Sequence, residues 1–82
     1  MQKYLNQLVE MLIRIKSAEE MKDFLKALLT PQELEIIPKR LEVIKLLKKG
    51  SSQRLIASRL NVGIATVTRG ARELKLNHFR NV

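Results

Sequence analysis

Apolar residues recur every three or four positions through the first half of the chain, which is the spacing of amphipathic helices. The first such segment, residues 2–16, has an unusually wide apolar face, and we expect part of it to be buried against a second chain. Further helices are predicted over residues 18–28 and 31–49. A kink or a helix restart is predicted near Ile37, because Pro38 cannot donate a helical hydrogen bond. No segment alternates apolar and polar residues as a strand does, so the sequence predicts an all-α fold.

Capping residues indicate where these helices begin and end. Ser17 and Thr30 are each followed three residues later by a glutamate, the arrangement known as a capping box. Pro31 then occupies a first helical position, where its missing N–H group has no intrahelical partner to lose. Gly50 is typical of a left-handed helix end, and Ser52 offers an N-terminal cap to the segment that follows.

Two short helices joined by a tight turn are predicted after Gly50, a helix-turn-helix pattern. Ala57 is small enough to let the second helix approach the first, and Asn61 suits a turn residue with positive φ. The second helix, residues 64–75, begins with short and β-branched side chains, which let it lie close to base edges in the DNA major groove. Its predicted DNA contacts are Ile64, Ala65, Thr66 and Thr68. The polar side chains expected to bind phosphates around it are Gln53, Arg54, Ser58, Arg59 and Arg72.

Charge is unevenly distributed along the chain, which has a net charge of +8. Residues 1–38 carry five basic and six acidic side chains, whereas residues 39–82 carry eleven basic and two acidic ones. So strong a positive field in the second half favours a polyanionic partner, double-stranded DNA, over a merely solubilising surface.

Composition excludes several other classes of protein. The chain has no cysteine and a single histidine, and it shows no metal-ligand cluster, nucleophile–base pair or glycine-rich phosphate loop. We therefore expect no catalytic residue, no metal, no cofactor and no enzymatic activity. No apolar run approaches the ~18 residues of a membrane span, and the N-terminal residues lack a cleavage site. A cytoplasmic protein with no membrane partner is the expectation.

At 82 residues the chain is predicted to form one domain with a thin core, so it is expected to rely on a second copy. Its expected parts are a dimerisation core over residues 1–50, a helix-turn-helix over 51–75 and a short C-terminal tail over 76–82.

Several separated motifs resemble the Trp repressor family. The stretch GIATVTRG at residues 63–70 is similar to that family's recognition helix. Three upstream motifs occur in the family's order: Leu29-Thr30-Pro31-x-Glu33, Arg40-x-x-Val43-Ile44-x-x-Leu47 and Ser52-Gln53-Arg54. The resemblance extends over roughly residues 24–75.

This resemblance implies an intertwined helical homodimer with a helix-turn-helix reading head. It also implies a repressor that binds a double-stranded DNA operator once an amino-acid co-repressor is bound, L-tryptophan or a related aromatic amino acid. The implied ligand contacts begin with two arginines that stack on the ring, Arg40 and Arg69. Thr30 is expected beside the carboxylate, and the backbone carbonyls of Ala27 and Leu29 are expected to accept from the ammonium group. Gly70, which has no side chain, is expected to leave space for the ring. Guanidinium groups are suited to this work, since they stack on aromatic faces and also bind carboxylates.

Glu73 departs from the family, which has a serine at this position. It lies four residues after Arg69 and therefore on the same helix face. Two interpretations stay open: Glu73 pairs with Arg69, or it binds the ligand's ammonium group directly. The first would favour an alternative function, a DNA-binding regulator or nucleoid-type protein with no small-molecule co-repressor.

Overall fold

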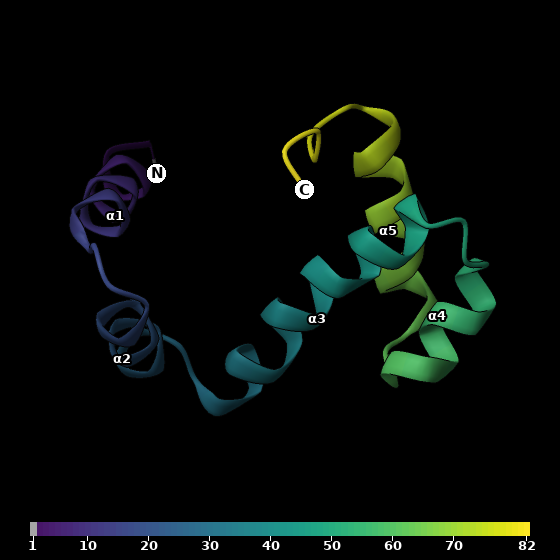
Figure 1. Cartoon of the computed structure of the whole chain (residues 1–82), viewed down its shortest axis with the longest axis horizontal. Coiled ribbons are helices and arrows are strands. Elements are labelled where there is room, and N and C mark those ends of the chain that lie inside the picture. Colours follow the sequence, from purple (N-terminus) through teal and green to yellow (C-terminus); the bar gives the residue numbers. More distant parts are fainter. Residues whose placement is uncertain (1) are drawn as a thin grey trace. The chain divides into compact units, whose positions relative to one another are not determined.

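The computed structural model describes residues 2–82, and every regular element in that range is an α-helix (Figure 1). The helices are α1 (Gln2–Arg14), α2 (Ala18–Leu28), α3 (Pro31–Lys48), α4 (Gln53–Leu60) and α5 (Ile64–Lys75). The predicted all-α fold is therefore confirmed. Contacts divide the chain into two units, one ending at Leu34 and the other spanning Glu35–Val82, and each is described by itself. Met1, the first residue of the predicted dimerisation core, lies outside the described residues, and the division into core, reading head and tail stays a prediction.

The first unit shows how capping side chains set the helix starts. Ser17 Oγ accepts a hydrogen bond from the backbone N–H of Glu20 at 3.0 Å. At the start of α3 the capping box closes in both directions: the Thr30 N–H donates to Glu33 Oε1 at 2.8 Å, and the Glu33 N–H donates to Thr30 Oγ1 at 3.2 Å. Hydrogen bonding by Thr30, chiefly from its backbone N–H and then by its side chain, holds the pKa of Glu33 below its usual value.

No described residue of α1 or α2 is buried within the single chain. Large apolar side chains of α1 instead remain exposed, Tyr4 at 70% and Ile13 at 66%. The wide apolar face expected of the first helix is thus present, and most of it stays exposed within this unit. None of the helices in residues 2–82 combines the length and apolar character needed to cross a membrane.

Two predicted helix boundaries are wrong. The first helix ends at Arg14 rather than at residue 16, because the chain turns there to place Ser17 in the extended conformation of an N-cap. Helix α3 continues through Pro38, so the predicted restart near Ile37 does not occur, whereas the kink predicted as its alternative stays a prediction. A single proline removes one N–H donor from the ladder, and the helical bonds of the neighbouring turns are sufficient to carry α3 past it.

The second unit contains the buried core. Four apolar residues from three helices form it: Val43, Leu46, Ile56 and Val67. Ile56 of α4 and Val67 of α5 are completely buried, so the two short helices are fixed to each other and to the last turns of α3. Half-buried Ala57 and Val62 pack against this core near the turn, as the sequence pattern predicts for a helix-turn-helix.

Candidate functional site

Local backbone geometry places α5 as the exposed second helix of the pair. The Ser52 side chain accepts from the Leu55 N–H at 3.2 Å and so begins α4. Asn61 ends α4 in the left-handed region at φ 53°, and its N–H reaches back to the carbonyls of Ala57 and Ser58. The chain then reverses, and α5 begins after Gly63. Asparagine is the residue expected there, because it tolerates positive φ better than other non-glycine residues.

The first turns of α5 carry the side chains predicted to contact DNA. Ile64, Ala65 and Thr68 are exposed, whereas Thr66 is half-buried. Thr68 Oγ1 donates a hydrogen bond to Gln53 Oε1 at 3.0 Å, which links the recognition helix to the first turn of α4. The structure therefore brings two of the predicted DNA contacts directly together. The remaining polar positions of this set are exposed: Arg54, Ser58, Arg59 and Arg72.

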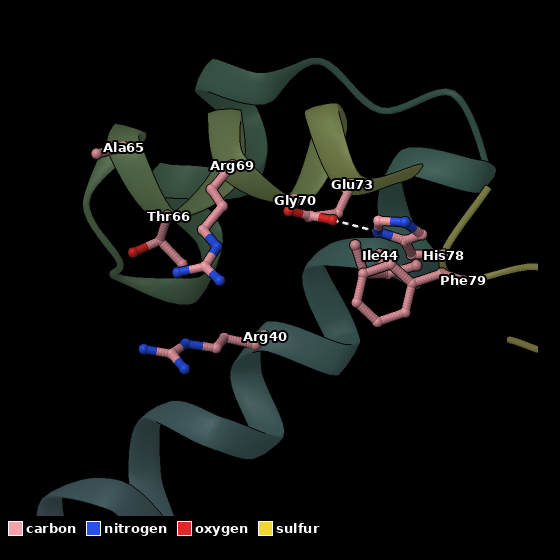
Figure 2. A pocket seen from close by; sticks show the side chains of 9 residues that line it. All are labelled: Arg40, Ile44, Ala65, Thr66, Arg69, Gly70, Glu73, His78 and Phe79. Atoms are coloured by element: carbon pink, nitrogen blue, oxygen red, sulfur yellow. Dashed lines mark hydrogen bonds and ion pairs between the residues drawn. The ribbon is translucent and has the colours of Figure 1, made fainter. Parts of the chain in front are cut away.

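A pocket of about 550 Å³ lies within the second unit, between α3, α5 and the segment after α5. Its lining residues are Arg40, Ile44, Ala65, Thr66, Arg69, Gly70, Glu73, His78 and Phe79 (Figure 2). Four of the seven predicted ligand residues are therefore brought together here: Arg40, Arg69, Gly70 and Glu73. Thr66, expected to contact DNA, lines this pocket as well.

Charge is separated across the pocket. Figure 2 shows the guanidinium groups of Arg40 and Arg69 toward one end, and Glu73 with His78 and Phe79 at the other. Arg40 comes from α3 and Arg69 from α5, so the two cations approach from different helices. A cationic end and an anionic end in one pocket are complementary to a small zwitterion.

Glu73 contacts His78, and not Arg69. His78 Nδ1 lies 2.5 Å from Glu73 Oε2, and among residues 2–82 the other side-chain ion pair is Lys39–Glu35. The hydrogen bond with His78 is the main reason that the pKa of Glu73 is lowered. Burial opposes this shift, and the charges of His78, Arg72 and Arg69 add to it.

The segment after α5 contributes to the pocket in a way that sequence analysis missed. Asn77 adopts the left-handed region at φ 64° and turns the chain back after α5. Lys48 Nζ then donates to the carbonyl oxygens of Phe79 at 2.7 Å and Val82 at 2.5 Å. This brings His78 and Phe79 to the pocket wall. The available signal was Asn77, because asparagine after a helix is a common left-handed turn residue.

Gly70 faces α3 as well as the pocket. A Cβ atom on Gly70 would lie 3.1 Å from Val43 Cγ1 and 3.2 Å from Ile44 Cδ1. Its role of leaving room for a ligand stays a prediction, and the observed contact adds a packing role: glycine lets α5 approach α3 closely.

Three further predicted ligand residues belong to the first unit. Ala27 is exposed near the end of α2, Leu29 caps that helix at its C-terminal end, and Thr30 caps α3. They are not among the residues that line the pocket of the second unit, so their contribution to a ligand site stays a prediction.

Two short helices packed around Ile56 and Val67 and joined at a left-handed asparagine define a helix-turn-helix protein. A family model described as Trp repressor protein matches residues 3–79, and the chain belongs to this family. Proteins of the family are DNA-binding regulators and not enzymes.

Curated relatives named Trp operon repressor homolog agree with this assignment. The chain is 36% identical over 75 residues to that of Xylella fastidiosa (strain M23), an alignment covering 90% of this chain and 82% of the relative. For Vibrio parahaemolyticus the identity is 41% over 70 residues, covering 84% and 68%. For Vibrio vulnificus (strain YJ016) it is 51% over 53 residues, covering 63% of this chain and about half of the relative, 52%. No solved structure gives a significant match.

Proposed function

We propose that this chain is a transcriptional repressor that binds a double-stranded DNA operator as a homodimer in the cytoplasm. Its co-repressor in this proposal is an aromatic amino acid, L-tryptophan or a close relative. The observation that carries the proposal is the position of α5, which borders a charge-separated pocket and also presents exposed short side chains such as Ala65 and Thr68.

DNA binding is supported by the surface around the start of α5. Because Gln53 Oε1 accepts from Thr68, the amide nitrogen of Gln53 is left to donate to a base or a phosphate. Arg54 and Arg72 are exposed and supply charge for the phosphate backbone. The +9 net charge of residues 39–82 adds a general attraction for duplex DNA.

A ligand switch is supported by residues that two hollows share. Ala65 and Arg69 line the 550 Å³ pocket and also a shallower hollow bordered by Thr68 and Arg72. A ring stacked between Arg40 and Arg69, with its carboxylate on a guanidinium, would fix the orientation of α5 relative to α3. The ligand shifts the population toward operator binding only by its preference for that orientation.

Dimerisation is supported by the unburied apolar face of α1, represented by Tyr4, Leu5 and Ile13. A second copy is the occupant proposed for this face. Two reading heads related by a two-fold axis would enter successive major grooves about 34 Å apart, as dimeric helix-turn-helix proteins, the Trp repressor among them, do.

The test combines ligand response and DNA binding in the same variant. Arg69→Ala is expected to abolish the amino-acid response in a fluorescence-anisotropy assay with operator duplex, while salt-sensitive non-specific binding is partly retained. Equal loss of both would mean that Arg69 is only a DNA contact. A thermal-shift screen with the twenty amino acids provides the second arm, since a ligand that binds the folded state raises the melting temperature. Stabilisation by none of them, with DNA binding intact, would favour the regulator without a co-repressor.

A further inference from the structure

The contact between Glu73 and His78 gives the short segment after α5 a role in ligand selection. We propose that His78 is an internal competitor for Glu73, so that a ligand's ammonium group must displace the imidazole before it can reach the carboxylate. This inference rests on the proposed amino-acid site and adds His78 to the residues that determine its selectivity.

The distribution of charge in the pocket supports this role of His78. Arg40 and Arg69 form the cationic end of the pocket, and Glu73 is its only carboxylate among the lining residues. A zwitterion that places its carboxylate on the guanidinium groups therefore has Glu73 as the complementary partner for its ammonium group. The titratable and charged groups that face Glu73 are His78, Arg72 and Arg69, and of these His78 is the one within hydrogen-bond distance.

The way in which His78 is held also allows it to be displaced. Lys48 binds the carbonyl oxygens of Phe79 and Val82 and so fixes the backbone of the segment that follows α5. This segment, rather than α5 itself, places His78 at the pocket. Its side chain is nevertheless 61% exposed, whereas that of Glu73 is 23% exposed. An exposed imidazole has room to swing into solvent while Glu73 stays at the wall. Displacement therefore requires no change in the helices.

Phe79 makes the same segment an apolar wall. It lines the pocket together with Ile44, at the end opposite to the two arginines (Figure 2). The segment thus contributes two groups to the pocket. His78 opposes the binding of an ammonium group, and Phe79 provides an apolar surface for the rest of the ligand. Loss of His78 is therefore expected to change the affinity for ligands that carry an ammonium group, and to leave the affinity for ligands without one unchanged.

The experiment compares L-tryptophan with indole-3-propionate, which keeps the ring and carboxylate but lacks the ammonium group. The chain contains no tryptophan, so the indole fluorescence of the probe reports binding directly. His78→Ala is expected to raise the affinity for L-tryptophan about two- to fivefold, the range of an exposed ion pair, and to leave that for indole-3-propionate unchanged. Glu73→Gln is expected to lower L-tryptophan affinity about tenfold and to spare indole-3-propionate. Glu42→Gln, the same change at an exposed α3 position, is the matched control.

Circular dichroism of each variant shows that the helices are retained. If His78→Ala lowers L-tryptophan affinity, or changes both affinities equally, His78 is not a competitor and the inference is wrong. If the wild-type chain binds neither probe, both the proposed amino-acid co-repressor and this inference are wrong. Retained operator binding in that case would support a DNA-binding regulator without a co-repressor. Binding of L-tryptophan with a DNA response, but with no effect of His78→Ala, would remove this inference alone.

Discussion

Replacing Gly70 with alanine measures how closely α5 packs on α3. The added Cβ atom would sit 3.1 Å from Val43 Cγ1 and 3.2 Å from Ile44 Cδ1, with Leu47 Cδ1 at 3.7 Å. The first two distances are shorter than ordinary van der Waals contact, and Val43 and Ile44 are both fully buried. The neighbours must therefore move by a few tenths of an ångström within a packed core.

Two opposing effects set the size of the change. Alanine is favoured over glycine inside a helix by about 0.8–1 kcal/mol. Overpacking of a well-packed core costs about 1–3 kcal/mol. The sum ranges from almost no change to a destabilisation of about 2 kcal/mol, and we expect about 1 kcal/mol. For a domain of this size that corresponds to a fall of about 4–8 °C in melting temperature.

Urea unfolding followed by circular dichroism, at fixed protein concentration, measures the effect. Ile44→Val provides a specific control because it removes the Cδ1 atom that the new Cβ would meet. That change alone should cost about 0.5–1.5 kcal/mol, and the double variant should lose less stability than the two single variants added together. If Gly70→Ala instead stabilises the chain by about 1 kcal/mol, and its effect simply adds to that of Ile44→Val, then α5 does not pack on α3 at this distance.

The remaining predictions concern the helix-turn-helix and the capping box of Thr30 and Glu33. Thr68→Val removes the hydroxyl that binds Gln53 while keeping the side-chain shape. It should weaken operator binding about fivefold and leave L-tryptophan affinity unchanged, whereas Thr68→Ser should restore most of the loss; anisotropy and ligand fluorescence measure the two quantities. Because the pKa of Glu33 is lowered by Thr30, its contribution to stability is present above the ordinary glutamate value of 4.5 and is lost as pH falls through the lower folded value. A carboxyl NMR titration should find the lowered pKa in the wild-type chain and a higher one in Thr30→Val, and an unchanged value would contradict the capping box.

Local signals in the sequence were sufficient for most of the second unit. Asn61 and Gly50 adopt the left-handed conformations that their residue types indicate, at φ 53° and 92°. Apolar spacing identified Ile56 and Val67, because burial of these residues is what holds two short helices together. Patterns of this kind depend only on residues close together in the sequence, so they can be recognised without knowing any long-range contact.

The pocket lined by Arg40 and Arg69 was only partly predictable. Resemblance to a family indicated Arg40 and Arg69, but it gave no reason to expect His78 or Phe79 at the wall. Those two residues reach the pocket because Lys48, about thirty positions earlier, binds the carbonyls of the last residues. Hydrogen bonds to backbone carbonyls place no requirement on the side chains they hold, so they leave no residue pattern to detect. The sequence left Glu73 open between Arg69 and a ligand; its observed side-chain partner is His78 rather than Arg69, and its binding of a ligand's ammonium group stays a prediction.

In the proposed repressor, the position of Arg69 in α5 links a bound ligand to the residues expected to contact DNA. Arg69 follows Thr68 directly, so the residue that borders the pocket and the residue bound to Gln53 point in different directions from the same turn of α5. Any ligand contact that rotates or tightens this turn must also move Thr68 relative to Gln53. In the proposed mechanism, ligand binding and base reading are therefore coupled through one helical turn of α5.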